Sequence, residues 1–271
     1  AEKIINKEVL RKIFKKRFND TLKGFDEQPT VWIEPIISRT SEISQNPDEN
    51  FSQRVLLEEL LLSEKSFIVH APSQFGLTTL AHHLILEAWE HDELWIYIDN
   101  SECKLHTIKN SVKNEINSLD QNIEPACIVF DSFNFKDKVS VKKFKILIES
   151  NPETKIIVLN TTDESFYLQE AQEEENEEVL EIDKQFENVH LIALPRNQIR
   201  NLVTQYNIEK RIAEDDILLS KVTSDLESLN MHRTPYNVIT LLKVSEKYFD
   251  DSPVNRTRVI EKFQNDSMLS Y

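Results

Sequence analysis

Residues 71 to 78, A-P-S-Q-F-G-L-T, form the stretch of this sequence whose residue types could bind phosphate. A phosphate-binding loop reads G-x-x-x-x-G-K-[ST] between a strand and a helix. Its backbone N–H groups hold the phosphates, its Lys neutralises them, and its Ser or Thr binds Mg²⁺. Gly76 and Thr78 match this pattern, whereas Ala71 replaces the first glycine and Leu77 replaces the lysine. Taken alone, the stretch is more typical of an ordinary turn between a strand and a helix.

Glycine usage adds weight to Gly76. Average usage near 7% predicts about 19 glycines in a chain of this length, but the sequence contains only Gly24 and Gly76. Glycine is needed where the backbone adopts conformations that other residues disfavour. Its retention at residue 76 therefore indicates a backbone requirement in this loop.

Two other polar residues end apolar runs further along the chain. The run C-I-V-F-D ends at Asp131, whose carboxylate could hold Mg²⁺ through water, and I-I-V-L-N ends at Asn160. Each residue also has a plain structural explanation, Asp131 as a helix cap and Asn160 as a turn residue. The order and spacing of the loop, Asp131 and Asn160 together favour a P-loop nucleotide-binding domain.

The elements that must position these residues alternate between strand and helix. Continuous apolar runs are typical of parallel strands covered on both faces, and alternation with helices predicts a three-layer α/β domain. We therefore expect a five-stranded, mainly parallel sheet, with ligands bound at the carboxyl ends of its strands. The expected strands cover residues 66–71, 93–99, 125–131, 154–160 and 188–195, and the helices between them about 78–90, 105–119 and 139–150.

The flanking sequence predicts three segments. Residues 1–52 would contain an N-terminal helix, with basic residues from Lys7 to Lys16, and an adenine-side segment. Residues 53–195 would form the α/β domain, in which the acidic run 170–187 is a solvated helix or an insertion. Residues 196–271 carry helical patterns and would form a helical lid domain.

Composition excludes several classes of protein. The net charge of −15 disfavours nucleic-acid binding, including a DNA-loading ATPase, because phosphate contacts need clustered Lys and Arg. Two cysteines and the absence of a long apolar run or a signal peptide lead us to expect a cytoplasmic chain without a membrane segment. Because it begins at Ala1, we expect it to be part of a longer protein.

The complete pattern resembles STAND-type NTPases, an AAA+-like branch of P-loop ATPases that act as signalling switches. In that family the Asp-containing strand reads h-h-h-h-D-[GAS]-h-D-E, and this chain reads C-I-V-F-D-S-F-N-F. Asp131, Ser132 and Phe133 fit, whereas Asn134 and Phe135 replace the acidic pair that prepares the attacking water. Neither replacement can act as a base. The resemblance extends over residues 28 to 265.

Two weaker matches extend the resemblance. The segment V-W-I-E-P resembles the family's adenine-side segment, which would place Ile33 and Pro35 near the base. The stretch H-R-T-P-Y-N resembles a motif over the nucleotide, with Pro235 at the base and His232 or Arg233 at phosphate. Trp32 could equally pack in a core, and Pro235 could equally begin a helix capped by Thr234.

The resemblance implies ATP or ADP with Mg²⁺, and a regulatory switch or oligomerisation platform in bacterial signalling or antiviral defence. Protein partners or self-association would follow from that role. The replacements at Leu77, Asn134 and Phe135 imply little or no hydrolysis. Two alternatives stay open: an interaction scaffold without a ligand, and an ATPase completed by a cation such as Arg196 or Arg233. The residues expected at the site are Ser73, Gln74, Phe75, Gly76, Leu77, Thr78, Thr79, Asn160, Arg233, Pro235, Ile33 and Pro35 for nucleotide, and Thr78 and Asp131 for Mg²⁺.

Overall fold

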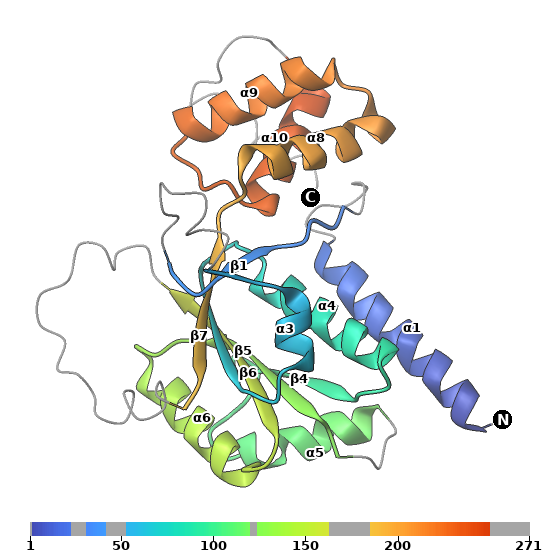
Figure 1. The fold of residues 1–271 in the computed structure, drawn as a ribbon, viewed down its shortest axis with the longest axis vertical. Coiled ribbons are helices and arrows are strands. Elements are labelled where there is room, and N and C mark those ends of the chain that lie inside the picture. Colours follow the sequence, from blue (N-terminus) through green and yellow to red (C-terminus); the bar gives the residue numbers. More distant parts are fainter. Residues whose placement is uncertain (1, 23–30, 42–52, 120–123, 163–184, 250–271) are drawn as a thin grey trace, which may run out of the picture. The chain divides into compact units, whose positions relative to one another are not determined.

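The structure, a computed structural model, describes residues 2–22, 31–41, 53–119, 124–162 and 185–249 (Figure 1). The chain divides into two compact units. The first comprises Ala1–Leu22 and Pro35–Ile192, and the second comprises Lys23–Glu34 and Ala193–Tyr271. No helix in the described ranges is both long and apolar enough to cross a bilayer.

The first unit contains a seven-stranded sheet in the order β2-β1-β7-β3-β6-β5-β4. Its five strands from β7 to β4 are parallel to one another, which confirms the predicted α/β class and mainly parallel sheet. The short strands β1 and β2 add an antiparallel edge next to β7. The strands are β1 (Ile36–Ser38), β2 (Arg54–Val55), β3 (Phe67–Pro72), β4 (Trp95–Asp99), β5 (Cys127–Phe133), β6 (Lys155–Thr162) and β7 (Glu187–Ile192).

The expected count of five strands therefore becomes seven. The added strands have three and two residues, too short for a period-two pattern to appear in the sequence. Val55 lies in β2 and pairs with Ile37. The short helix α3 (Leu57–Leu62) begins after Leu56.

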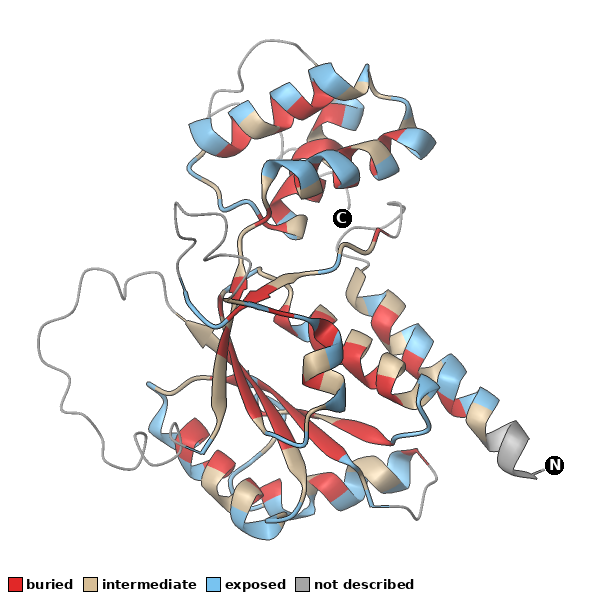
Figure 2. Ribbon diagram, viewed as in Figure 1, coloured by how far each residue is buried: buried red, intermediate tan, exposed pale blue. Residues whose placement is uncertain are grey.

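Helices cover both faces of the sheet, which makes three layers (Figure 1). His82 of α4 (Leu77–Glu90) lies against Tyr97 of β4, and Phe144 of α6 (Lys138–Ser150) lies against Phe130 of β5. Tyr97 pairs with Val129 in register, so it points to the face opposite Phe130 because successive strand residues alternate. α5 (Ile108–Ser118) follows β4, and Figure 2 shows that burial concentrates in the strands between these layers.

The N-terminal helix α1 (Glu2–Leu22) packs on α4. Phe14 is buried and meets Trp89 edge to face, with ring centroids 5.9 Å apart, and the Trp89 indole N–H donates to the Lys7 carbonyl at 3.0 Å. Ion pairs with acidic residues of the first unit flank this contact. Several basic residues of α1 are thus paired, through Lys7–Asp92, Arg11–Glu90 and Arg17–Glu115.

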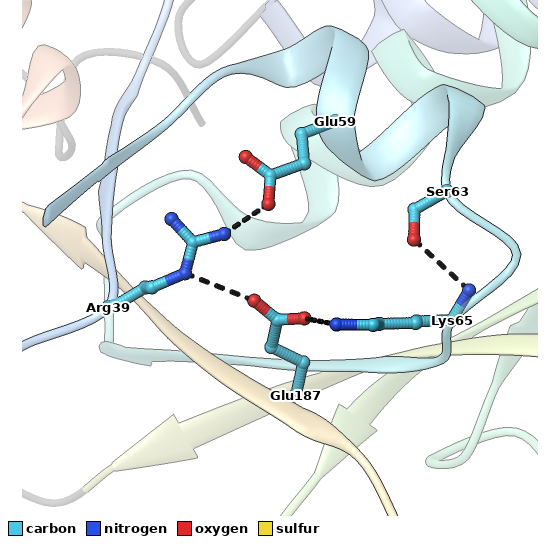
Figure 3. A network of polar contacts seen from close by, with 5 residues as sticks. All are labelled: Arg39, Glu59, Ser63, Lys65 and Glu187. Carbon is cyan, nitrogen blue, oxygen red and sulfur yellow. Dashed lines mark hydrogen bonds and ion pairs between the residues drawn. The ribbon is translucent and has the colours of Figure 1, made fainter. Parts of the chain in front are cut away.

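A polar network ties the short edge strands to the parallel sheet (Figure 3). Arg39, just after β1, bonds to Glu59 of α3 and donates to Glu187 of β7 at 3.1 Å. Lys65 donates to the other oxygen of Glu187 at 3.0 Å. Burial alone would raise the pKa of Glu187, but these donors lower it. The network holds together segments that the two short strands would join only weakly.

The second unit is helical. α8 (Arg196–Lys210), α9 (Asp215–Ser228) and α10 (Pro235–Tyr248) pack against one another around a separate core that includes Tyr206. α10 begins with Pro235 in its first turn, and the Thr234 hydroxyl accepts a hydrogen bond from the Asn237 N–H at 3.2 Å. This confirms the structural explanation of Pro235 as a helix-starting proline capped by Thr234.

Candidate nucleotide site

The loop between β3 and α4 has the backbone geometry that its glycine suggested. β3 ends at Pro72 and α4 begins at Leu77, with Gly76 in a left-handed conformation at φ 89° and ψ 27°. A Cβ added at Gly76 would meet no atom within 4 Å. The backbone conformation, rather than lack of space, therefore requires glycine here. Gln74 also has a positive φ of 68°, so the turn is tightly wound.

The start of α4 offers its backbone N–H groups to an anion. The first N–H groups of a helix lack intrahelical partners and carry the positive end of its dipole. Neither an acidic residue nor a side-chain cap occupies the first turn of α4. Of the other predicted residues here, Ser73 and Gln74 are exposed, Thr79 is half-buried, and the half-buried Phe75 packs against the hydrophobic core.

Leu77, which stands in the lysine position, faces the protein interior. Its side chain is 7% exposed and belongs to the hydrophobic core of the first unit. The lysine position therefore contributes apolar packing and brings no charge to the loop. This orientation was not predicted, because the sequence shows only that the cation is missing.

Thr78 and Asp131, the residues predicted to bind Mg²⁺, are in direct contact. The Thr78 hydroxyl donates to Oδ2 of Asp131 at 2.7 Å, and the Tyr97 hydroxyl donates to the same oxygen at 2.8 Å. The Ser132 N–H donates to Oδ1 at 2.7 Å. Ser132 has a φ of 57°, where the pairing of β5 with β6 shifts register between Phe130 and Phe133. This irregularity turns the strand end around the carboxylate.

Burial dominates the electrostatics of Asp131. The residue is 3% exposed, and this desolvation raises the pKa of its carboxyl above the ordinary value, although the three hydrogen bonds oppose the shift. Burial and the Asp131 charge also raise the pKa of Tyr97, so this hydroxyl stays protonated and remains a donor. The Tyr97 hydroxyl is thus a neutral donor, and the Asp131 carboxyl that accepts its hydrogen bond is less acidic than usual.

The residue types at this contact fit Mg²⁺, which prefers carboxylate and hydroxyl oxygens. Thr78 and Asp131 would hold the ion, and it would supply positive charge to a bound phosphate. However, Oδ2 of Asp131 already accepts two hydrogen bonds. Across the described ranges, no group of three His, Cys, Asp or Glu side chains is arranged to hold a metal.

Asn160 lies in a polar network across three parallel strands. It is 5% exposed and pairs in register with His70 of β3. Its Nδ2 bonds to Nδ1 of His70 at 2.9 Å, and Nε2 of His70 bonds to Oδ1 of Asn188 in β7 at 2.6 Å. The Oδ1 atom of Asn160 has no hydrogen-bond partner among the described residues. Asn160 is therefore held from one side and keeps one unused acceptor.

Aromatic rings enclose this network. His70 stacks on His190 of β7 with centroids 5.0 Å apart and lies over Phe135 at 6.3 Å. Phe135 also meets Phe133 edge to face at 4.7 Å. The side-chain oxygen of Asn134 accepts from the Lys136 N–H at 2.8 Å and so belongs to a local turn. The two positions of the family's acidic pair thus serve packing and turn formation.

We expect acid to destabilise the first unit through two of its histidines. Burial, with a smaller effect of Arg17, lowers the pKa of His82 to about 4, and burial, with a smaller effect of His70, does the same for His190. The unfolded chain, with pKa near 6.5, then binds more protons than the folded one between these values. This contribution to stability is complete above pH 6.5 and is lost as the pH falls towards 4.

Urea unfolding between pH 7 and pH 4.5 measures this effect. After allowance for solvent screening we expect the two histidines to account for about 2 kcal/mol of lost unfolding free energy. The comparison is with the double variant His82→Gln, His190→Gln, whose stability should depend less on pH. Equal pH dependence of both proteins would contradict the assignment.

The remaining predicted residues are divided between the two units. Pro35 belongs to the first unit, which contains the loop, whereas Ile33, Arg233 and Pro235 belong to the second. Ile33 packs against the core of the second unit, and the carbonyl of Arg233 accepts from the Leu194 N–H at 2.7 Å. Their roles at a nucleotide stay predictions.

Sequence reasoning missed three polar residues of the site. Tyr97 reaches Asp131 from the neighbouring strand, and Asn188 and His190 reach His70 from β7. Tyr97 could have been noticed because it lies two residues before Asp99, at the carboxyl end of an expected strand and on the same face. No local signal marks Asn188 or His190, because their role depends on the pairing of β7 with β3.

Comparisons with known proteins found similar folds only. No family model and no curated protein match the sequence. The replication initiator DnaA bound to AMPPCP and single-stranded DNA is 12% identical with a TM-score of 0.47, over 74% of this chain and 61% of that one. AMPPCP-bound DnaA from Aquifex aeolicus is 13% identical with a TM-score of 0.47, over 69% and 57%. A RuvB mutant from Thermotoga maritima is 14% identical with a TM-score of 0.41, over 74% and 70%.

The chain spans 61% and 57% of the two DnaA structures it matches. Because every TM-score is below 0.5, these similarities assign neither a family nor an activity to the chain. The residues of the site must carry any functional proposal.

Proposed function

We propose that the first unit is a P-loop-type nucleotide-binding module that binds ATP or ADP and hydrolyses it slowly or not at all. The contact between the Thr78 hydroxyl and the Asp131 carboxylate carries this proposal. It joins the first turn of the helix after the loop to the end of a different strand. A phosphate–metal site needs these two residue types together.

The surrounding geometry supports binding. Gly76 has a left-handed backbone at the start of α4, where N–H groups favour an anion. β6 lies between β3 and β5, so Asn160 lies near the carboxyl end of a strand between the loop and Asp131, and the second N–H of its side-chain amide could donate to a terminal phosphate.

The same geometry argues against turnover. Leu77 is buried and supplies no cation, and Asn134 and Phe135 supply no carboxylate to activate water. Without charge stabilisation and a general base, the chemical step loses two sources of rate enhancement. A module that binds nucleotide without consuming it suits a regulatory switch or an oligomerisation platform.

The finer assignment rests on the sequence resemblance alone. We propose a STAND-like role in bacterial signalling or antiviral defence, with protein partners or self-association and a cytoplasmic location. Arg233, Pro235, Ile33 and Pro35 would then complete the nucleotide site, with Mg²⁺ at Thr78 and Asp131. The second unit would act as the helical lid.

Thermal unfolding with and without nucleotide tests the proposal. At ten times its dissociation constant, ADP or ATP should stabilise the folded chain by about 1.4 kcal/mol. For a unit of this size the midpoint should rise by about 3 to 5 °C. Thr78→Val should reduce the rise. In the same samples, phosphate release from ATP should stay at the background rate.

Thr204→Val is a matched control, because the Thr204 hydroxyl also donates to a carboxylate, Asp215, at 2.8 Å, but lies in the second unit. It should lower stability without changing the response to nucleotide. If several millimolar nucleotide caused no rise in the unfolding midpoint, a ligand-free interaction scaffold would remain as the function of the chain. Turnover that Asp131→Ala abolishes would show an active ATPase, and loss of that turnover in Arg196→Ala or Arg233→Ala would identify its cation.

A further inference from the structure

We infer that Tyr97 suppresses divalent-metal binding at Thr78 and Asp131, so that a nucleotide on the loop is held with little contribution from Mg²⁺. The nucleotide part of this inference rests on the proposed function, whereas the metal part concerns only the described side chains. Tyr97 would thereby determine which form of the ligand binds, the free nucleotide rather than its metal complex.

The first observation is the occupancy of the Asp131 carboxylate. A carboxylate offers about four acceptor positions. Three are in use: Thr78 and Tyr97 donate to Oδ2, and the Ser132 N–H donates to Oδ1. The position left is on Oδ1, whereas Thr78 contacts Oδ2; a water on a Mg²⁺ ion held by Thr78 would therefore meet Oδ2 and compete there with the Tyr97 hydroxyl.

The second observation is that the Tyr97 side chain is fixed in the position from which its hydroxyl donates to Asp131. Its ring lies against His82 of α4 at a centroid distance of 4.4 Å, and its backbone is part of the parallel sheet. A side chain fixed in this way loses little entropy when it forms its hydrogen bond. A metal-bound water would have to displace this donor and break its hydrogen bond to a charged acceptor, which is unfavourable.

Thr78 does not compete in the same way. Its hydroxyl donates its hydrogen to Asp131, while its oxygen keeps lone pairs for a cation. The Thr78–Asp131 bond is therefore compatible with metal binding, whereas the added Tyr97 bond opposes it. Removing the Tyr97 hydroxyl alone should free the acceptor without dismantling the pair.

The neighbouring carboxylate provides no ready substitute. Asp99 pairs in register with Asp131 at the end of the adjacent strand. Its Oδ1 accepts from the Ser101 N–H at 2.8 Å and from the Ser101 hydroxyl at 2.7 Å. Both acidic residues at this edge of the sheet are thus already hydrogen-bonded within the protein, which lowers their value as metal ligands.

Mn²⁺ binding, followed by electron paramagnetic resonance on the full chain without nucleotide, tests the metal part. Wild type should bind Mn²⁺ only weakly, and Tyr97→Phe should bind about tenfold more tightly, the loss expected for one hydrogen bond to a charged group. Tyr97→Phe keeps the ring that contacts His82. The gain should disappear in the double variant Tyr97→Phe, Asp131→Asn, which would place the ion at Asp131.

Tyr206→Phe is the matched control, because the Tyr206 hydroxyl also donates to a carboxylate, Glu246, at 2.9 Å, but in the second unit. It should bind Mn²⁺ as wild type does. Equal or weaker Mn²⁺ binding by Tyr97→Phe would overturn the inference. Tight Mn²⁺ binding by wild type that is lost in Asp131→Asn would also overturn it, even if Tyr97→Phe failed to fold.

Nucleotide titrations separate this inference from the proposed function. In wild type, the affinity for ADP should change less than about threefold between EDTA and millimolar Mg²⁺, whereas Tyr97→Phe should gain about tenfold from Mg²⁺. A tenfold Mn²⁺ contrast with no nucleotide binding by either protein would support the metal inference and reject the nucleotide module. Nucleotide binding that depends equally on Mg²⁺ in both proteins would support the nucleotide module and reject the metal inference.

Discussion

Leu77→Lys should lower the free energy of unfolding by about 3 kcal/mol and should not produce an ATPase. Leu77 is 7% exposed within the hydrophobic core, so a lysine there must bury its ammonium group or displace the start of α4. The positive end of the α4 dipole adds a further unfavourable interaction. Urea unfolding and an ATP-turnover assay on the same preparation measure both parts of the result.

Leu77→Met is the control, because it keeps the volume and apolar character and should cost less than about 1.5 kcal/mol. Wild-type stability together with tighter nucleotide binding by Leu77→Lys would contradict the buried orientation of residue 77. That outcome would mean that the lysine reaches the loop, as it does in an intact phosphate-binding motif.

Phe144→Ala should cost the first unit about 3 to 5 kcal/mol of unfolding free energy, the range for truncating a buried phenylalanine. Phe144 is fully buried, and its ring lies 5.1 Å from Phe133, 5.6 Å from Phe130 and 5.6 Å from Phe186. A cavity at its position would remove support from several rings at once. Urea unfolding followed by the fluorescence of Trp89 and Trp95, both in the first unit, reports the change.

Val139→Ala on the same helix is the control, because Val139 is 50% exposed and should change stability by less than about 0.5 kcal/mol. A cost below about 1 kcal/mol for Phe144→Ala would show that the aromatic cluster is loosely packed. Phe135, at one position of the family's acidic pair, contacts Phe133 of this cluster. The stability of the cluster therefore indicates how strongly packing constrains residue 135.

Leu77 and Phe135 share a physical feature. At these positions, where the family that the sequence resembles has a lysine and an acidic residue, this chain has side chains that pack in or against the hydrophobic core. We expect that introducing the family's residue at such a position would not create the site, because the surrounding side chains fit the residue that is present.

Local sequence patterns determined the parallel part of the fold. Runs such as F-I-V and C-I-V-F are buried on both faces, and an apolar strand of this kind is visible in one segment without knowledge of its neighbours. The missing lysine, the need for Gly76 and the capping of α10 by Thr234 were also readable locally. Each depends on a residue type and its immediate chain neighbours.

Tertiary structure alone decided the interactions across strands. β3 lies between β7 and β6 although β7 follows it by more than a hundred residues, and this order brings Asn188 and His190 to His70. The adjacency of β4 and β5 brings Tyr97 to Asp131. The burial of Leu77 depends on how α4 packs. Strand order and helix packing minimise the free energy of the whole core, so no single stretch of sequence encodes them.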